Sequence, residues 1–76
     1  MKTYVKIIDT LDAIDFIRAT NNIDVNFTLK RGITCVDGKS IMGVLCICGN
    51  GVITVNAENG DIDLFNKRIE RFKVTV

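Results

Sequence analysis

The stretch IDVNFTLK, residues 23–30, alternates apolar and polar side chains at every position. Its apolar members are Ile23, Val25, Phe27 and Leu29, and a polar or charged residue follows each of them. A period of two residues is typical of a β-strand that buries one face and leaves the other in water. We therefore predict a strand here, in a sheet with one solvated side.

Three further stretches are short and rich in β-branched residues, and we expect a strand in each of them. They are TYVKII (3–8), GITCV (32–36) and VITVNA (52–57). Arg31 and Gly32 lie where the second strand gives way to the third, so we predict a hairpin turn at these two residues.

Three stretches with helical spacing of apolar residues lie between or after the strands. The first, LDAIDFIRAT (11–20), can be capped by Asp9 or Thr10. Its apolar stripe is expected to contain Leu11, Ile14 and Ile17, with Phe16 as a further candidate.

The second predicted helix, IMGVLCI (41–47), follows Ser40, whose side chain can cap it, and Gly49 can close it. The third, DIDLFNKRIERF (61–72), has acidic residues early and basic residues late, as the helix dipole prefers. Its apolar face is expected at Ile62, Phe65, Ile69 and Phe72.

The predicted order of elements is β-α-β-β-α-β-α. If the fourth strand inserts between the first and second, each helix returns the chain to the same face of a four-stranded antiparallel sheet. We expect an α+β fold, an open-faced β-sandwich with three helices on one face, and a single domain over residues 1–76. A chain of 76 residues is too short for a large enclosed active site.

The charge pattern argues against nucleic acid or a membrane as the partner. Ten Lys and Arg stand against nine Asp and Glu, so the formal net charge is +1 and no strong field attracts polyanions. No apolar run approaches the ~20 residues that a membrane span needs, and residues 1–4 lack the apolar core of a signal peptide. We expect a cytoplasmic protein.

The three cysteines, Cys35, Cys46 and Cys48, are an odd number without a disulfide spacing. A closed zinc site needs four ligands, whereas the chain offers three thiols and no histidine. We interpret the thiols as buried or half-buried structural residues in a reducing compartment, and we expect no metal and no cofactor.

One segment of the chain resembles a known family. KSIMGV (39–44), then Leu45, a short spacer with glycine and VITV (52–55), is similar to the HPr family, the small phosphocarriers of the bacterial sugar phosphotransferase system. DVNF (24–27) also looks like the second strand of that family. The resemblance implies the HPr fold over essentially the whole chain.

The chain departs from the family at the start of the first helix. There the phosphocarriers have a segment of the type Gly-Ile-His-Ala-Arg-Pro, whose histidine carries the phosphoryl group. Residues 8–14 read IDTLDAI, the segment is several residues shorter, and the chain has no histidine. Asp9, Asp12 and Asp15 would repel a phosphate, and Arg18 lies a helical turn or more away. We therefore expect no phosphoryl transfer and no enzymatic activity.

Ser40 is then the residue of greatest interest, because the resemblance implies that it is a target of a regulatory kinase. In relatives the modified protein binds a transcriptional regulator of carbon catabolism. We expect a protein-binding surface of Lys39, Ser40, Ile41, Met42 and Gly43, with Met42 exposed and Ile41 either exposed or buried.

The sequence thus favours a non-catalytic, HPr-like regulatory protein related to the sugar phosphotransferase system. Its expected partner is a protein, either a carbon-regulation protein or a serine kinase. Two alternatives stay open: a small metal or redox protein that uses Cys35, Cys46 and Cys48, and an interaction module unrelated to sugar uptake.

Overall fold

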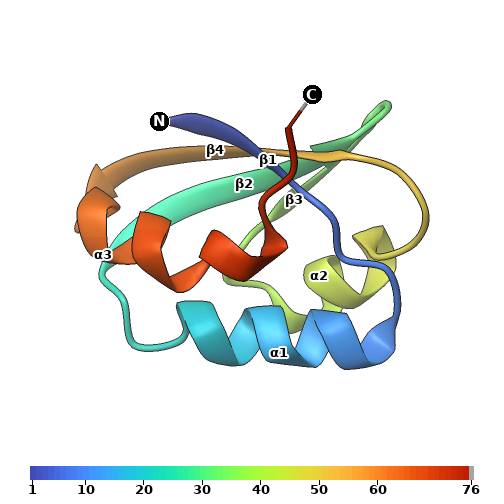
Figure 1. Ribbon diagram of the computed structural model, residues 1–76, viewed down its shortest axis with the longest axis horizontal. Helices are drawn as coiled ribbons and strands as arrows, with labels where there is room; N and C mark the ends of the chain where they lie inside the picture. Colours follow the sequence, from blue (N-terminus) through green and yellow to red (C-terminus); the bar gives the residue numbers. More distant parts are fainter. Residues whose placement is uncertain (76) are drawn as a thin grey trace.

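The computed structural model describes residues 1–75 and contains the predicted elements in the predicted order (Figure 1). The strands are β1 (Lys2–Val5), β2 (Val25–Arg31), β3 (Thr34–Asp37) and β4 (Ile53–Gly60). The helices are α1 (Thr10–Thr20), α2 (Ile41–Ile47) and α3 (Ile62–Arg68), followed by a 3₁₀ turn at Glu70–Phe72.

The four strands form one antiparallel sheet in the order β1-β4-β2-β3, which confirms the insertion of the fourth strand between the first and second. Val55 at the centre of β4 lies between Thr3 of β1 and Leu29 of β2. The helices lie on one side of this sheet (Figure 1). The fold is therefore the predicted open-faced α+β sandwich.

The alternation in β2 is confirmed residue by residue. Val25, Phe27 and Leu29 are buried, whereas Asn26 and the other intervening residues are exposed on the side away from the helices.

The hairpin turn after β2 is displaced by one residue from the prediction. Arg31 still pairs with Thr34, so the turn consists of Gly32 and Ile33. Gly32 has φ +62°, a conformation that glycine adopts without steric cost.

The apolar stripe predicted for α1 is wrong for Leu11 and Ile14, whereas the candidate Phe16 is buried and Ile17 is half-buried. Leu11 is 73% exposed and Ile14 is 37% exposed, whereas Ala13 and Phe16 are fully buried. The helix is rotated so that Phe16 points into the core, where it has more apolar surface to bury than Leu11 or Ile14. Thr20 lies on the same buried side, and its hydroxyl donates to the carbonyl of Phe16 at 3.0 Å.

The predicted helix over residues 61–72 is not continuous, because α3 ends at Arg68 and the chain tightens into a 3₁₀ turn. Three of the four expected apolar residues are buried, namely Phe65, Ile69 and Phe72, and Ile62 is half-buried. After the turn, the chain runs beside β1. There the carbonyl of Phe72 accepts from the Lys6 amide at 2.9 Å, and the Val74 amide donates to the carbonyl of Tyr4 at 3.0 Å.

None of the four strands has the predicted bounds, and β2 and β3 each begin two residues later and end one residue later than expected. β1 ends at Val5, because the Lys6 amide turns to the carbonyl of Phe72. β4 continues three residues further than expected, to Gly60. Near its end Val25 pairs with Gly60 and Asn26 pairs with Glu58, so Asn59 is an extra, bulged residue.

Candidate functional site

Ser40 caps α2, as the sequence predicts. Its hydroxyl oxygen accepts a hydrogen bond from the Gly43 amide at 3.1 Å, and its carbonyl accepts one from the Val44 amide at 3.0 Å. The carbonyl of Asp37 fixes the approach to the helix by accepting from the Ser40 amide at 3.0 Å. Ser40 itself is exposed to solvent.

Gly49 lies two residues beyond Ile47, the last residue of α2. The C-cap is Cys48, whose amide donates to the carbonyl of Val44 at 3.2 Å. Gly49 has φ +146°, and its amide donates to the carbonyl of Ile7 at 2.8 Å. The end of α2 is thereby connected to the loop between β1 and α1.

Lys39 is next to Ser40 in sequence, but its amine points to another part of the molecule. Its Nζ donates to the carbonyls of Thr20 and Ile23, at 3.0 and 2.7 Å, and lies 5.9 Å from the centre of the Phe27 ring. Lys39 therefore ties the entry of α2 to the end of α1. A phosphate on Ser40 would have to compete for this amine.

Ile41, Met42 and Gly43 have different surroundings. Ile41 is 59% exposed and Met42 is 70% exposed, so both side chains face solvent. Gly43 instead lies against β3, since a Cβ atom at this position would be 3.0 Å from Cβ of Val36. The glycine thus allows α2 to approach the sheet closely.

Apolar residues of α1 and α2 meet at one point. Leu11, Ile14 and Ile17 succeed one another every three residues and form a row along α1, in which Leu11 and Ile14 are exposed and Ile17 is half-buried against the core. At the end of this row Ile17 and Ile41 line the same small hollow, of about 160 Å³. We call Leu11, Ile14, Ile17, Ile41 and Met42 the α1–α2 surface.

Sequence reasoning missed Leu11 and Ile14 as surface residues because they fit an apolar stripe. A competing stripe was present in Ala13, Phe16 and Thr20, which also follow helical spacing and include the largest apolar side chain of the helix. The size of Phe16 was the signal that could have identified the buried side.

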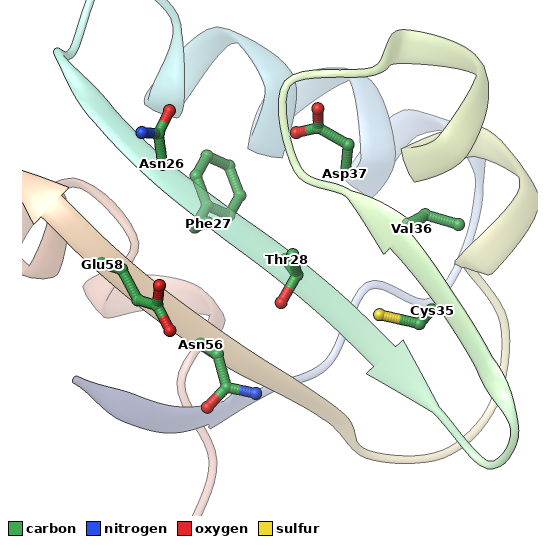
Figure 2. A pocket seen from close by; sticks show the side chains of 8 residues that line it. All are labelled: Asn26, Phe27, Thr28, Cys35, Val36, Asp37, Asn56 and Glu58. Carbon is green, nitrogen blue, oxygen red and sulfur yellow. The ribbon is translucent and has the colours of Figure 1, made fainter.

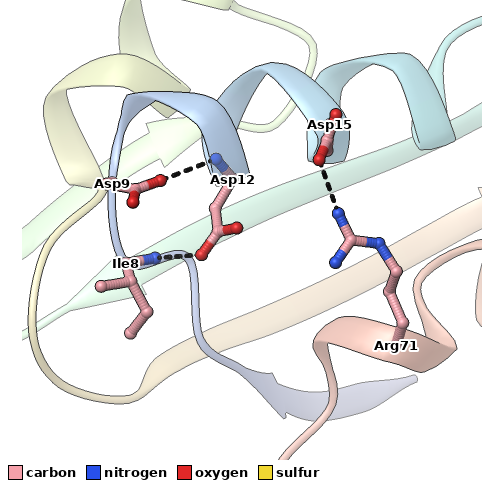
Figure 3. A network of polar contacts seen from close by, with 5 residues as sticks. All are labelled: Ile8, Asp9, Asp12, Asp15 and Arg71. Carbon is pink, nitrogen blue, oxygen red and sulfur yellow. Dashed lines mark hydrogen bonds and ion pairs between the residues drawn. The ribbon is translucent and has the colours of Figure 1, made fainter.

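The acidic residues at the start of α1 bind the backbone of their own segment (Figure 3). Asp9 caps the helix by accepting from the Asp12 amide at 2.9 Å, and the Asp12 carboxylate accepts from the Ile8 amide at 3.1 Å. Asp15 forms an ion pair with Arg71, which joins α1 to the 3₁₀ turn, at 2.8 Å. Two backbone amides that an anion would use are thus already occupied by carboxylates.

Two of the three cysteines are more exposed than predicted. Cys35 and Cys46 are exposed and Cys48 is half-buried, with its thiol donating to the carbonyl of Leu45 at 3.2 Å. The expectation of buried thiols is therefore wrong for Cys35 and Cys46, because β3 and α2 turn these side chains away from the core. Within residues 1–75, no three His, Cys, Asp or Glu side chains are grouped in a way that could hold a metal ion.

A second hollow, larger than the one beside Ile41, lies on β2, β3 and β4 (Figure 2). It measures about 390 Å³ and is lined by residues with amide, hydroxyl, thiol and carboxylate groups together with two apolar residues. The lining residues are Asn26, Phe27, Thr28, Cys35, Val36, Asp37, Asn56 and Glu58. The hollow is open to solvent and lies apart from the α1–α2 surface (Figure 2).

Comparisons with known proteins identify the fold. No family model matches the chain, and no curated protein does either. Among solved structures, the chain is similar to HPr-C-His from Thermoanaerobacter tengcongensis, at 21% identity and a TM-score of 0.69, covering 92% of this chain and 91% of that one. It is also similar to a phosphocarrier protein HPr from Bacillus anthracis strain Ames, at 21% identity and a TM-score of 0.71, covering 96% of each chain. The protein has the HPr fold.

The cap at Ser40 gives a testable prediction for stability. Replacing Ser40 with Ala removes the acceptor for the Gly43 amide, and we expect the free energy of unfolding to fall by about 1 kcal/mol. Ser40→Asp should retain most of the stability, because aspartate accepts the same hydrogen bond and its charge suits a helix N-terminus. Urea unfolding of the three proteins measures both effects. Equal loss in the Ala and Asp variants would contradict the capping role.

Proposed function

We propose that this chain is a protein-binding module of the HPr fold, which docks a partner through the α1–α2 surface and does not relay phosphate. The observation that carries the proposal is the exposure of Leu11, Ile41 and Met42, at 73%, 59% and 70%, on two adjacent helices. Contiguous exposed apolar groups are typical of interaction surfaces, whereas single ones are common on any protein.

These side chains are not part of the buried core. Phe16, Val44 and Ile47 supply the buried contacts of α1 and α2. An apolar partner surface would remove Leu11 and Met42 from water, at a gain of about 25 cal/mol for each Å² buried. Methionine also adapts its shape to a partner at little cost. The proposed partner is therefore a protein with an apolar contact surface.

The proposal excludes a phosphohistidine relay because of residues at the start of α1. The resemblance to the HPr family implies a histidine at this place, but the sequence contains none. The Asp9 and Asp12 carboxylates occupy amides of this segment and carry charges that oppose an incoming phosphate. The proposed binding role requires neither catalysis nor phosphoryl transfer by this protein.

Ser40 is the proposed regulatory residue of this surface. It is exposed directly before Ile41 and Met42, so a phosphate there would add a charge of about −2 at the edge of the apolar contact. The N-terminus of α2 would stabilise that charge by about 1 kcal/mol. The proposed modifying enzyme is a serine kinase, and the proposed partner of the modified form is a carbon-regulation protein.

The proposed location is the cytoplasm. Cys35 and Cys46 are exposed free thiols, which persist in a reducing compartment. No helix within residues 1–75 is long and apolar enough to cross a membrane. The thiols have no part in the proposed binding.

The absence of a relay is tested by phosphoryl transfer. The protein is incubated with phosphoenolpyruvate and the first enzyme of the sugar phosphotransferase system, with a histidine-containing HPr as the positive control. We expect no label on this chain, because it lacks the nitrogen nucleophile. Acid-labile phosphate at a stoichiometric level would refute the proposal.

The docking surface is tested by site-specific photo-crosslinking in the native cell. A photoreactive residue is placed at Leu11, at Met42 or at Ile33, the fully exposed apolar residue of the hairpin turn. We expect the same protein adduct from positions 11 and 42 and no such adduct from position 33. An adduct confined to position 33, or none at positions 11 and 42, would contradict the proposal.

With the captured partner purified, Met42→Ala should weaken binding about tenfold, a typical loss for a central apolar contact. Ile33→Ala is the matched control and should leave the affinity unchanged. A partner from sugar uptake or carbon regulation would support the regulatory role. An unrelated partner at the same positions would assign the module to another process.

A further inference from the structure

The chain contains two Asn-Gly pairs, Asn50–Gly51 and Asn59–Gly60. Asn-Gly is the dipeptide in which the backbone amide most readily attacks the preceding side chain, because glycine has no Cβ to obstruct the approach. All four residues are exposed to solvent. Differences in their reactivity must therefore come from the backbone rather than from access to water.

Asn50 and Gly51 lie in the loop that joins α2 to β4, outside any helix or strand. Within residues 1–75, the Gly51 amide donates no hydrogen bond, so its nitrogen is free to move. The carbonyl of Asn50 accepts from Nη1 of Arg31 at 3.5 Å, which is the long limit for such a bond. Little in the structure resists rotation about ψ of Asn50, the backbone dihedral that brings the Gly51 nitrogen towards the Asn50 side chain.

Asn59 and Gly60 are held by the sheet instead. Asn59 is the bulged residue of β4, with φ +57°, and Gly60 pairs with Val25 of β2. The next amide, that of Asp61, donates to the carbonyl of Asp24 at 2.8 Å. Gly60 also lies tightly against β2, since a Cβ atom there would be 1.9 Å from the carbonyl oxygen of Asp24. Rotation at Asn59 requires this end of the sheet to open.

We propose that Asn50 is a site of spontaneous modification, at which the folded protein converts asparagine to isoaspartate and aspartate. The Gly51 nitrogen loses its proton and attacks Cγ of Asn50, forming a C–N bond. The side-chain amide nitrogen leaves as ammonia, and a five-membered succinimide remains. One water molecule then opens the ring at either carbonyl and gives isoaspartate or aspartate. No oxidant, reductant or enzyme is needed.

The modification changes the charge of the molecule and the path of the loop. One new carboxylate lowers the formal net charge from +1 to 0. It forms on the residue whose carbonyl contacts Arg31, so an ion pair becomes available there. Isoaspartate also adds one methylene group to the backbone between the end of α2 and Val52, an exposed apolar residue. The inference does not depend on the proposed docking function.

The test compares the two Asn-Gly pairs within one molecule. Wild-type protein is incubated in mildly alkaline buffer, which favours loss of the Gly51 amide proton, and digested for peptide mapping at intervals. In the folded protein we expect conversion at Asn50 to be at least about tenfold faster than at Asn59. A tenfold difference corresponds to a free energy of about 1.4 kcal/mol for opening the sheet at Asn59. In concentrated urea the two rates should become similar.

Two results would overturn the proposal. One is conversion at Asn59 that equals or exceeds conversion at Asn50 in the folded protein. The other is a rate at Asn50 that rises about tenfold or more in urea, because the folded loop would then protect it. In the Asn50→Gln variant the side chain is one carbon longer, so the attack would have to close a six-membered ring and is slower. The charge change that wild-type protein shows early on ion exchange should therefore be missing in this variant. Its persistence would also contradict the proposal.

Discussion

The packing of the four phenylalanines is the interaction on which the rest of the structure depends. All four of the chain's phenylalanine rings join one cluster that connects α1, β2, α3 and the 3₁₀ turn. Ring centres are 4.6 Å apart for Phe27 and Phe65, 5.1 Å for Phe16 and Phe72, and 6.1 Å for Phe16 and Phe27. The last two pairs meet edge to face, a geometry that adds to the gain from burial.

This cluster determines the surface as well as the core. Phe16 contacts both β2 and the 3₁₀ turn, so α1 has one rotation in which both contacts are made. In that rotation Ala13 faces inward, Leu11 and Ile14 face outward, and Ile17 lies beside Ile41. The apolar α1–α2 surface is therefore a consequence of how the core is filled.

The strands, their order and the cap at Ser40 could be predicted because each depends on local patterns. Alternation identified β2, and the insertion of β4 followed from placing both crossing helices on one face. The rotation of α1 could not be predicted, since two stripes of similar apolar character compete and only packing against Phe27 and Phe72 decides between them. Equally non-local are the contacts of the Lys39 amine with the carbonyls of Thr20 and Ile23. These contacts join residues that are far apart in the sequence, so no local sequence pattern reveals them.

The rotation of α1 is tested most directly by the stability of Leu11→Ala, measured by urea unfolding beside Phe16→Ala. If Leu11 faces solvent, its removal changes the free energy of unfolding by no more than about 0.5 kcal/mol, as for other surface substitutions. Phe16→Ala should cost about 3–5 kcal/mol, because it empties the aromatic cluster. A loss of about 2 kcal/mol or more in Leu11→Ala would place that residue in the core and contradict the account of both the fold and the surface.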